Sequence, residues 1–103
     1  MELTEEIIVT PTTQSRLQEV DFSKLGFGNY ISDHMLISYY RNGHWETPRI
    51  QPFGDISVSP TTLALHYGQA VFEGLKAFTM HDGRINLFRI HKHYDRFVQS
   101  LNR

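Results

Sequence analysis

Residues His66–Phe78 read HYGQAVFEGLKAF, and the rest of the chain is organised around this segment. Apolar residues in and just before its first half recur at helical spacing: Leu63, Tyr67, Ala70 and Val71. Gly74 predicts the end of this helix, because glycine enters the left-handed conformation without a Cβ clash. From Leu75 onward the side chains alternate as in a strand. We therefore expect a helix-to-strand corner that presents Tyr67 and Phe72 to a cleft.

The segments on either side of this stretch predict how the corner is supported. Ser59-Pro60-Thr61 is typical of a helix start, with serine as N-cap and proline at the first helical position, so the helix is expected to run on to about Phe72. Asp82-Gly83 predicts a two-residue hairpin turn. That turn implies the following register: Met80 with Ile85 and Phe78 with Leu87 on one apolar face, and Thr79 with Asn86 and Ala77 with Phe88 on the other.

The N-terminal part predicts another hairpin after a lead-in of residues 1–26. The lead-in holds a strand-like run, Ile7–Val9, and a helical turn within Arg16–Leu25 that has Leu17 and Val20 as its apolar face. Met35–Tyr40 is a predicted strand, and Asn42-Gly43 favours a tight turn after it. This turn pairs Tyr40 with Trp45 and Ser38 with Thr47. Pro48 and Pro52 lack N–H donors, which predicts that the return strand is an edge strand or is bulged.

The last predicted helix starts at about Ile90 and has two distinct faces. Its apolar stripe consists of Ile90, Tyr94, Phe97, Val98 and Leu101. A basic and polar edge flanks the stripe and consists of Arg89, His93, Arg96 and Ser100. This edge is either a solvated surface or a site where an arginine meets an anion, and its spacing leaves both open. Together the elements predict an α+β fold, an antiparallel sheet of hairpins packed with two amphipathic helices.

Composition restricts the classes of function. The 103 residues are 40% apolar and 20% charged, as in an ordinary globular domain. A net charge of −1 offers no electrostatic reason to expect nucleic acid or an anionic membrane as a partner. There is no cysteine and no apolar run of the roughly 20 residues that a membrane span needs, so we expect a soluble, cytoplasmic protein. The end at Arg103, in or just after a helix, suggests a piece of something larger.

The residues alone predict a pocket wall and no catalytic group. The six histidines show no zinc-ligand spacing, and His91 and His93 would point about 200° apart on a helix, so no metal site is expected. The glycines form neither a phosphate loop nor a dinucleotide motif. No serine lies in a nucleophile elbow.

Four segments together resemble the branched-chain amino acid aminotransferases, which belong to the class IV pyridoxal-phosphate aminotransferases. These segments are FGNYISDHM from Phe27, PRIQPF from Pro48, HYGQAVFEGLKAF from His66 and LFRIHKHYDRF from Leu87. The resemblance extends from Phe27 to about Leu101. It implies that residues 27–103 form the N-terminal small domain of the D-amino-acid-aminotransferase-like fold, roughly the first third of a family member.

The resemblance also implies an activity. Family members transfer the amino group of leucine, isoleucine or valine to 2-oxoglutarate, which becomes glutamate, with pyridoxal phosphate as cofactor and as homodimers. The cofactor is bound to a lysine of the large domain. Lys24, Lys76 and Lys92 match no such position. We therefore expect this chain to lack the catalytic lysine and to be inactive by itself.

Individual site residues follow from the same resemblance. Arg96 matches the arginine that binds the cofactor's phosphate. Tyr67 and Phe72 match aromatic residues that enclose the branched side chain, and Tyr67 can serve the neighbouring subunit's pocket. Phe27 and Tyr30 are weaker matches to the same wall. The alternatives are a D-amino acid aminotransferase or an aminodeoxychorismate lyase of the same fold, or a stand-alone, non-catalytic α+β binding module.

Overall fold

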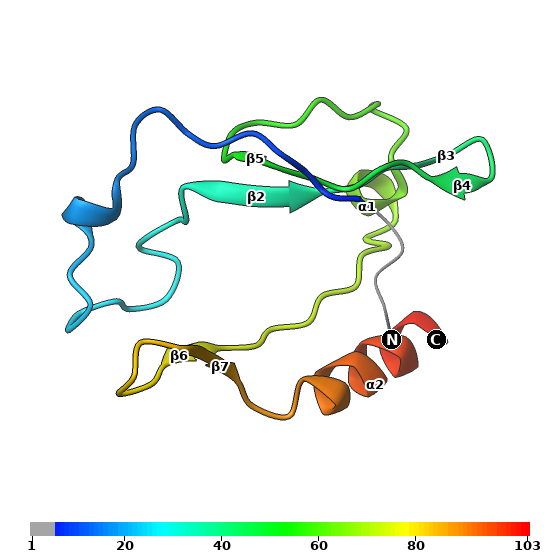
Figure 1. Ribbon diagram of the computed structural model, residues 1–103. Helices are drawn as coiled ribbons and strands as arrows, with labels where there is room; N and C mark the ends of the chain where they lie inside the picture. The colour runs from blue at the N-terminus through cyan, green and yellow to red at the C-terminus, as the bar shows by residue number, and fades with distance from the viewer. Residues whose placement is uncertain (1–5) are drawn as a thin grey trace. The chain divides into compact units, whose positions relative to one another are not determined.

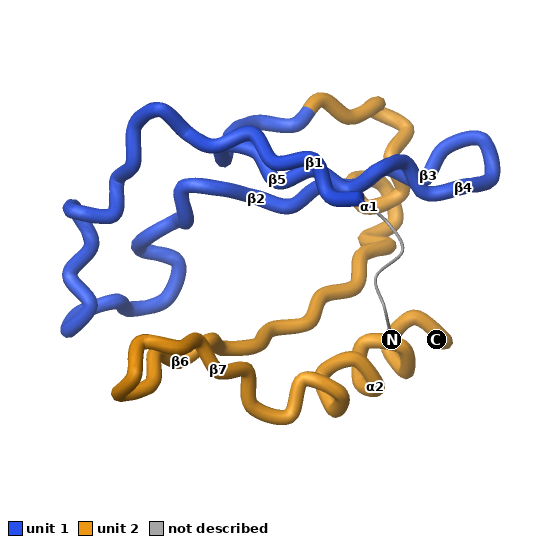
Figure 2. The backbone as a smooth tube through the Cα atoms, in the orientation of Figure 1, with its two compact units in different colours: residues 1–56 blue, residues 57–103 orange. Residues whose placement is uncertain are grey.

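The computed structural model describes residues 6–103, which divide into two compact units (Figure 2). The first unit ends at Ile56 and the second comprises Ser57–Arg103. The first five residues of the predicted lead-in lie outside the described part. Figure 1 shows the elements in chain order, strands dominating the first unit and both α-helices lying in the second. The α+β class is confirmed, whereas the assignment of residues 27–103 to the family's small domain stays a prediction.

A three-stranded sheet organises the first unit, with strand order β1-β5-β2. Its strands are β1 (Ile8–Val9), β2 (His34–Ile37) and β5 (Arg49–Pro52). Strand β5 pairs in parallel with β1 and antiparallel with β2. The prediction that this proline-flanked strand is an edge strand is therefore wrong, because β5 is central. The prolines are tolerated since Pro48 precedes the strand, where its carbonyl accepts the Ile8 N–H at 3.1 Å, and Pro52 is its last residue.

The predicted Asn42-Gly43 hairpin is confirmed in strands β3 (Tyr40–Arg41) and β4 (His44–Trp45). Tyr40 pairs with Trp45 as expected, and their rings meet edge to face with centroids 5.3 Å apart. The predicted pair of Ser38 with Thr47 lies outside the ladder, because the Ser38 hydroxyl donates instead to the Glu46 carbonyl at 2.7 Å.

The predicted bulge is present between this hairpin and the three-stranded sheet. The hairpin pairs Tyr40 with Trp45, whereas β2 and β5 pair Ile37 with Arg49. The return strand therefore contains one residue more than its partner, at Thr47-Pro48. This bulge divides the predicted strand Met35–Tyr40 into β2 and β3.

Replacing Tyr40 by alanine is expected to loosen the β3–β4 hairpin, by about 0.2–1 kcal/mol for the lost cross-strand aromatic pair. Trp45 is the chain's single tryptophan, so its near-ultraviolet circular dichroism reports on this pair. We expect most of that signal to be lost in Tyr40→Ala. The matched control is Tyr39→Ala, since the Tyr39 ring contacts the Arg41 guanidinium at 4.1 Å instead of Trp45. Equal spectra for the two variants would contradict the pairing.

The lead-in is held by side-chain hydrogen bonds rather than by a helix. The predicted helical turn within Arg16–Leu25 shortens to a 3-10 turn, η1 (Leu17–Glu19), because Asp21 accepts bonds from the Ser23 N–H and hydroxyl at 3.0 and 2.6 Å and so favours a local turn. Asp33 accepts the Ser15 hydroxyl at 2.6 Å and the Arg16 N–H at 2.9 Å. These two bonds, that from Ser15 foremost, lower the pKa of Asp33 and fasten the lead-in beside β2.

The helix of the second unit is much shorter than predicted. Helix α1 spans Leu63–His66, whereas the sequence pattern predicted a helix from Ser59 to about Phe72. Ser59 is not its N-cap; its carbonyl and hydroxyl instead form a turn with the next three residues. The stop is Gly68 rather than Gly74, since Gly68 has a φ of +63° and the Tyr67 N–H closes the last turn on Leu63 at 2.8 Å. A short helix without a buried face gains too little from packing to extend past this glycine.

The second hairpin forms, but the predicted register is wrong by one residue. Strands β6 (Ala77–Thr79) and β7 (Ile85–Leu87) are joined by a longer loop, in which the Met80 N–H donates to the Arg84 carbonyl and the Gly83 N–H to the Met80 carbonyl. The observed pairs are Ala77 with Leu87, Phe78 with Asn86, and Thr79 with Ile85. The extra loop residue is typical of three-residue hairpin loops, and it removes the predicted face of apolar pairs.

Helix α2 (Ile90–Leu101) confirms the predicted last helix. It carries the predicted apolar stripe, yet none of the described side chains is fully buried, and Tyr94 is 67% exposed. The half-buried side chains of the second unit gather where the loop before β6 meets α2, notably Val71, Glu73, His93 and Phe97. The strands form three separate sheets rather than one sheet covered by helices. The packed centre of the second unit is therefore this loop-to-helix contact.

Candidate functional site

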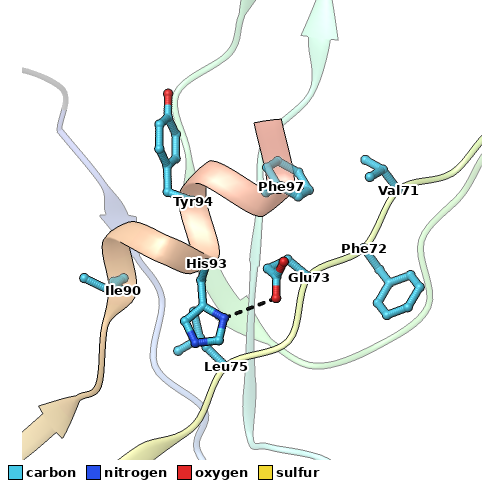
Figure 3. Close-up of a pocket in the computed structure, with 8 residues that line it drawn as sticks. All are labelled: Val71, Phe72, Glu73, Leu75, Ile90, His93, Tyr94 and Phe97. Atoms are coloured by element: carbon cyan, nitrogen blue, oxygen red, sulfur yellow. Dashed lines mark hydrogen bonds and ion pairs between the residues drawn. The ribbon is translucent and has the colours of Figure 1, made fainter. Parts of the chain in front are cut away.

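A carboxylate from the loop before β6 binds two side chains of α2. Glu73 accepts a hydrogen bond from Arg96 Nε at 2.6 Å and a second from Arg96 Nη2, so the guanidinium is held through two of its nitrogens. His93 Nδ1 lies 3.2 Å from the same carboxylate, and Figure 3 marks this interaction with a dashed line. The Gly74 N–H donates to it at 3.0 Å. Glu73, His93 and Arg96, here called the Glu73 network, join two segments that are 20 to 23 residues apart in the sequence.

Glu73 and Arg96 both remain charged over the whole neutral pH range. The Arg96 hydrogen bond is the main reason that the pKa of Glu73 falls to about 2, and the His93 bond lowers it further against the opposing effect of burial. In return, Glu73 raises the pKa of Arg96. The Glu73 side chain is only 12% exposed, whereas that of Arg96 is 65% exposed. The carboxylate is thus the enclosed member of the pair, and the guanidinium remains accessible to a ligand.

Three hollows on the second unit share His93, and two of them are lined by a member of the Glu73–Arg96 ion pair. The larger, here the apolar groove, has a volume of about 510 Å³. It is drawn in Figure 3 and lined by Val71, Phe72, Glu73, Leu75, Ile90, His93, Tyr94 and Phe97. The smaller, here the basic cavity, has a volume of about 360 Å³ and is lined by Phe88, Arg89, Lys92, His93 and Arg96. Glu73 lines the groove and Arg96 lines the cavity, so the ion pair separates an apolar surface from a cationic one.

The cations of the basic cavity come from one helix and the residue before it. Arg89, Lys92 and Arg96 are three and four residues apart, which places them along one side of α2. Arg89 is the N-cap and has a φ of +52°, a left-handed conformation that is costly for a residue with a Cβ. Such strained residues gather at functional sites. Three cations with one aromatic wall form a surface that suits an anion with several oxygen acceptors, such as a phosphate group.

The structure brings together some of the predicted site residues. Arg96 lines the basic cavity, and Phe72, 88% exposed, lines the adjoining apolar groove. Tyr67 is 77% exposed at the end of α1 and lines neither of these two hollows. Phe27 and Tyr30 belong to the first unit, where Phe27 is fully exposed. The roles assigned to all five residues stay predictions.

Two residues of this site were missed from the sequence, Glu73 and Lys92. Lys92 matches no cofactor lysine, and the sequence assigns it no other role, whereas the structure places it beside Arg89 and Arg96 in the basic cavity. Glu73 has no periodic relation to Arg96, because 23 residues separate them. One signal was present: Glu73 is a lone charge in the apolar run AVFEGL, and charges that become enclosed are usually paired.

No group of three or more histidine, aspartate or glutamate side chains in residues 6–103 could hold a metal ion. Within the same range no helix is both long and apolar enough to cross a membrane.

Comparison with known proteins gives consistent matches over most of the chain. It is 44% identical over 87 residues to Branched-chain-amino-acid transaminase 1 of Bacillus subtilis (strain 168), a match that covers 84% of this chain and 24% of that protein. It is 37% identical over 102 residues to Branched-chain-amino-acid aminotransferase 2 of the same organism, covering 98% of this chain and 28% of that protein. A relative from Monosiga brevicollis, named Branched-chain-amino-acid aminotransferase, is 41% identical over 96 residues, covering 92% of this chain and 24% of that protein. No protein-family model matches the chain.

An arginine-lined cavity and an apolar groove that share His93 place a cationic surface next to an apolar one. The relatives then confirm the resemblance to the branched-chain-amino-acid aminotransferases, to which the chain is homologous over most of its length. It spans about a quarter of the length of these relatives.

Proposed function

We propose that this chain is the small-domain segment of a branched-chain amino acid aminotransferase, which transfers the amino group of leucine, isoleucine or valine to 2-oxoglutarate with pyridoxal phosphate. The observation that carries the proposal is the basic cavity beside the apolar groove on one helix. In this reading the chain supplies a cofactor contact and a side-chain wall. The reactive lysine would come from the remaining three quarters of the relatives' length.

The basic cavity fits the cofactor's phosphate. A phosphate dianion needs several donors and compensating positive charge, and Arg89, Lys92 and Arg96 supply both. Arg96 would hold the phosphate through the guanidinium nitrogen that Glu73 does not engage. When bound, pyridoxal phosphate would supply the electron sink for amino-group transfer, and the role of these residues is to bind and orient it.

The apolar groove fits the substrate's side chain. A branched aliphatic group offers no hydrogen-bonding handle, so its recognition depends on an apolar surface of limited size. Most of the groove's lining is aliphatic or aromatic, and Phe72 is its most exposed member. The groove is open in this chain, and we propose that the large domain, or the second subunit of a homodimer, closes it. Tyr67, Phe27 and Tyr30 are proposed contributors to that completed wall.

The test compares this chain with a complete enzyme, which we define as the chain continued by a large domain, either its own or that of the Bacillus subtilis transaminase 1. With 2-oxoglutarate as acceptor, the complete enzyme is expected to produce glutamate from leucine, isoleucine and valine. The chain alone is expected to show no transfer. After borohydride reduction with pyridoxal phosphate, mass spectrometry should find no stoichiometric label on any single lysine of the chain.

Three outcomes would contradict this proposal. A stoichiometric label on Lys24, Lys76 or Lys92 would show that the chain itself carries the reactive amine. Preference of the complete enzyme for D-alanine over L-leucine would favour the D-amino acid aminotransferase alternative. Absence of transfer, together with absence of cofactor binding in a folded complete enzyme, would favour the non-catalytic binding module.

A further inference from the structure

We propose that Glu73 is a positioning residue for anion binding in the basic cavity, acting through Arg96 and not through contact with the ligand. This inference deepens the proposed function and rests on it. Its basis is the geometry of the Glu73 network. Glu73 engages Nε and Nη2 of Arg96, and Nη1 makes no hydrogen bond to any residue within 6–103. The bonded edge thereby fixes the plane of the guanidinium and leaves Nη1 available to a ligand.

The placement of the charges keeps the carboxylate away from the anion. Glu73 lines the apolar groove and is absent from the lining of the basic cavity, whereas Arg96 lines the cavity. A phosphate in the cavity would therefore meet Arg96, Lys92 and Arg89, with the carboxylate behind the guanidinium. The long arginine side chain, 65% exposed, would otherwise lose much rotamer freedom when it binds a ligand. Glu73 removes part of that cost in advance, which is the general benefit of preorganisation.

His93 connects the two hollows and completes the network. Its Nδ1 lies 3.2 Å from the carboxylate, and its ring lines both the groove and the cavity. The His93 bond holds the carboxylate in the rotamer that reaches Arg96. The Gly74 N–H contributes a further bond from the loop, at 3.0 Å. Glu73 is consequently fixed by its own loop and by α2.

The positioning role and a purely electrostatic role predict opposite changes in anion affinity when Glu73 loses its charge. If Glu73 only contributed its negative charge, Glu73→Gln would strengthen anion binding, because a nearby repulsive charge is removed. If Glu73 positions Arg96, the same variant loosens the guanidinium and weakens binding. We expect weakening by about tenfold, within the range over which contacting residues couple. The direction of the change therefore separates the two roles.

The experiment is a double-mutant cycle in the complete enzyme, with pyridoxal phosphate and inorganic phosphate as probes. The four proteins are the parent, Glu73→Gln, Arg96→Lys and the double variant. A lysine keeps the positive charge but lacks the planar guanidinium that bonds to Glu73 through two nitrogens. In the Arg96→Lys background, Glu73→Gln should therefore change the dissociation constants less than twofold. Dissociation constants of both probes are measured for the cofactor-free proteins, and thermal unfolding checks that each is folded.

The possible results are distinguishable. Tighter or unchanged binding in Glu73→Gln would overturn the positioning role. If Glu73→Gln weakened binding equally with arginine and with lysine at position 96, the positioning role would also be overturned. Glu73 would then act independently of the Arg96 guanidinium. A folded parent that binds neither probe would overturn the proposed function itself. If Glu73→Gln does not fold, Glu73→Asp serves in the same cycle, because a carboxylate one methylene shorter keeps the charge and breaks the two-point geometry.

Discussion

Replacing Arg96 by alanine is expected to weaken retention of pyridoxal phosphate by the complete enzyme by about tenfold to a hundredfold, the range for losing a charge-assisted arginine contact. Arg96 lines the basic cavity and is held in place by Glu73, so its loss removes both the donor and the geometry of the site. The measurement is the cofactor dissociation constant, obtained by titrating the cofactor-free enzyme and following the absorbance of the bound cofactor.

The control for this prediction is Arg84→Ala. Arg84 is also an exposed arginine of the second unit, but it pairs with Asp82 at 2.6 Å in the β6–β7 loop, and it is absent from the lining of the basic cavity. Its replacement is expected to leave cofactor affinity unchanged within twofold. An Arg96→Ala enzyme that is folded and retains the cofactor as well as Arg84→Ala does would remove Arg96 from the site.

Replacing Phe72 by alanine is expected to relax selectivity for branched substrates. The Phe72 ring is part of the apolar groove, and its removal enlarges the space that a leucine side chain would fill. Since one methylene in an apolar pocket is worth about 1–3 kcal/mol of discrimination, losing a whole ring should lower the preference for leucine over alanine at least tenfold. The measurement is the ratio of kcat/KM values for L-leucine and L-alanine.

The control for Phe72 is Phe22→Ala. Phe22 is an exposed aromatic of the first unit, 68% exposed, and is absent from the lining of the apolar groove. Its replacement should leave the leucine-to-alanine ratio unchanged. If Phe72→Ala lowered the rates with both substrates in equal proportion, the residue would support the enzyme's structure and would not select the side chain.

Features that depend on neighbouring residues could be predicted from the sequence. The two hairpins show how far such local prediction extends. The Asn42-Gly43 turn has two left-handed residues in succession, at φ values of +55° and +83°, so it specified both the loop and the Tyr40–Trp45 pair. Asp82-Gly83 is a dipeptide of the same turn-forming type, yet the chain forms a longer loop there and the register moves by one residue. The loop choice depends on hydrogen bonds of Met80 and Arg84 that lie beyond the dipeptide.

The predicted helix-to-strand corner failed for a related reason. Apolar spacing from Leu63 to Val71 is compatible with a helix, but spacing alone does not say whether its apolar face is buried. With Leu65 66% and Tyr67 77% exposed, packing stabilises too little of that helix, and Gly68 ends it. Tyr67 and Phe72 consequently do not share a helical scaffold, and the structure places only Phe72 in the apolar groove.

The sequence alone was sufficient to predict the amphipathic helix α2, its basic edge and the first hairpin, because each depends on residues within a few positions of one another. It also determined the relationship to the aminotransferases, through four segments in a fixed order. Only the tertiary structure decided that Glu73 binds Arg96 and that the ion pair separates an apolar groove from a basic cavity. The reason is that this contact joins a loop to a helix across 23 residues. No local sequence pattern indicates which two charged residues will pair at such a separation.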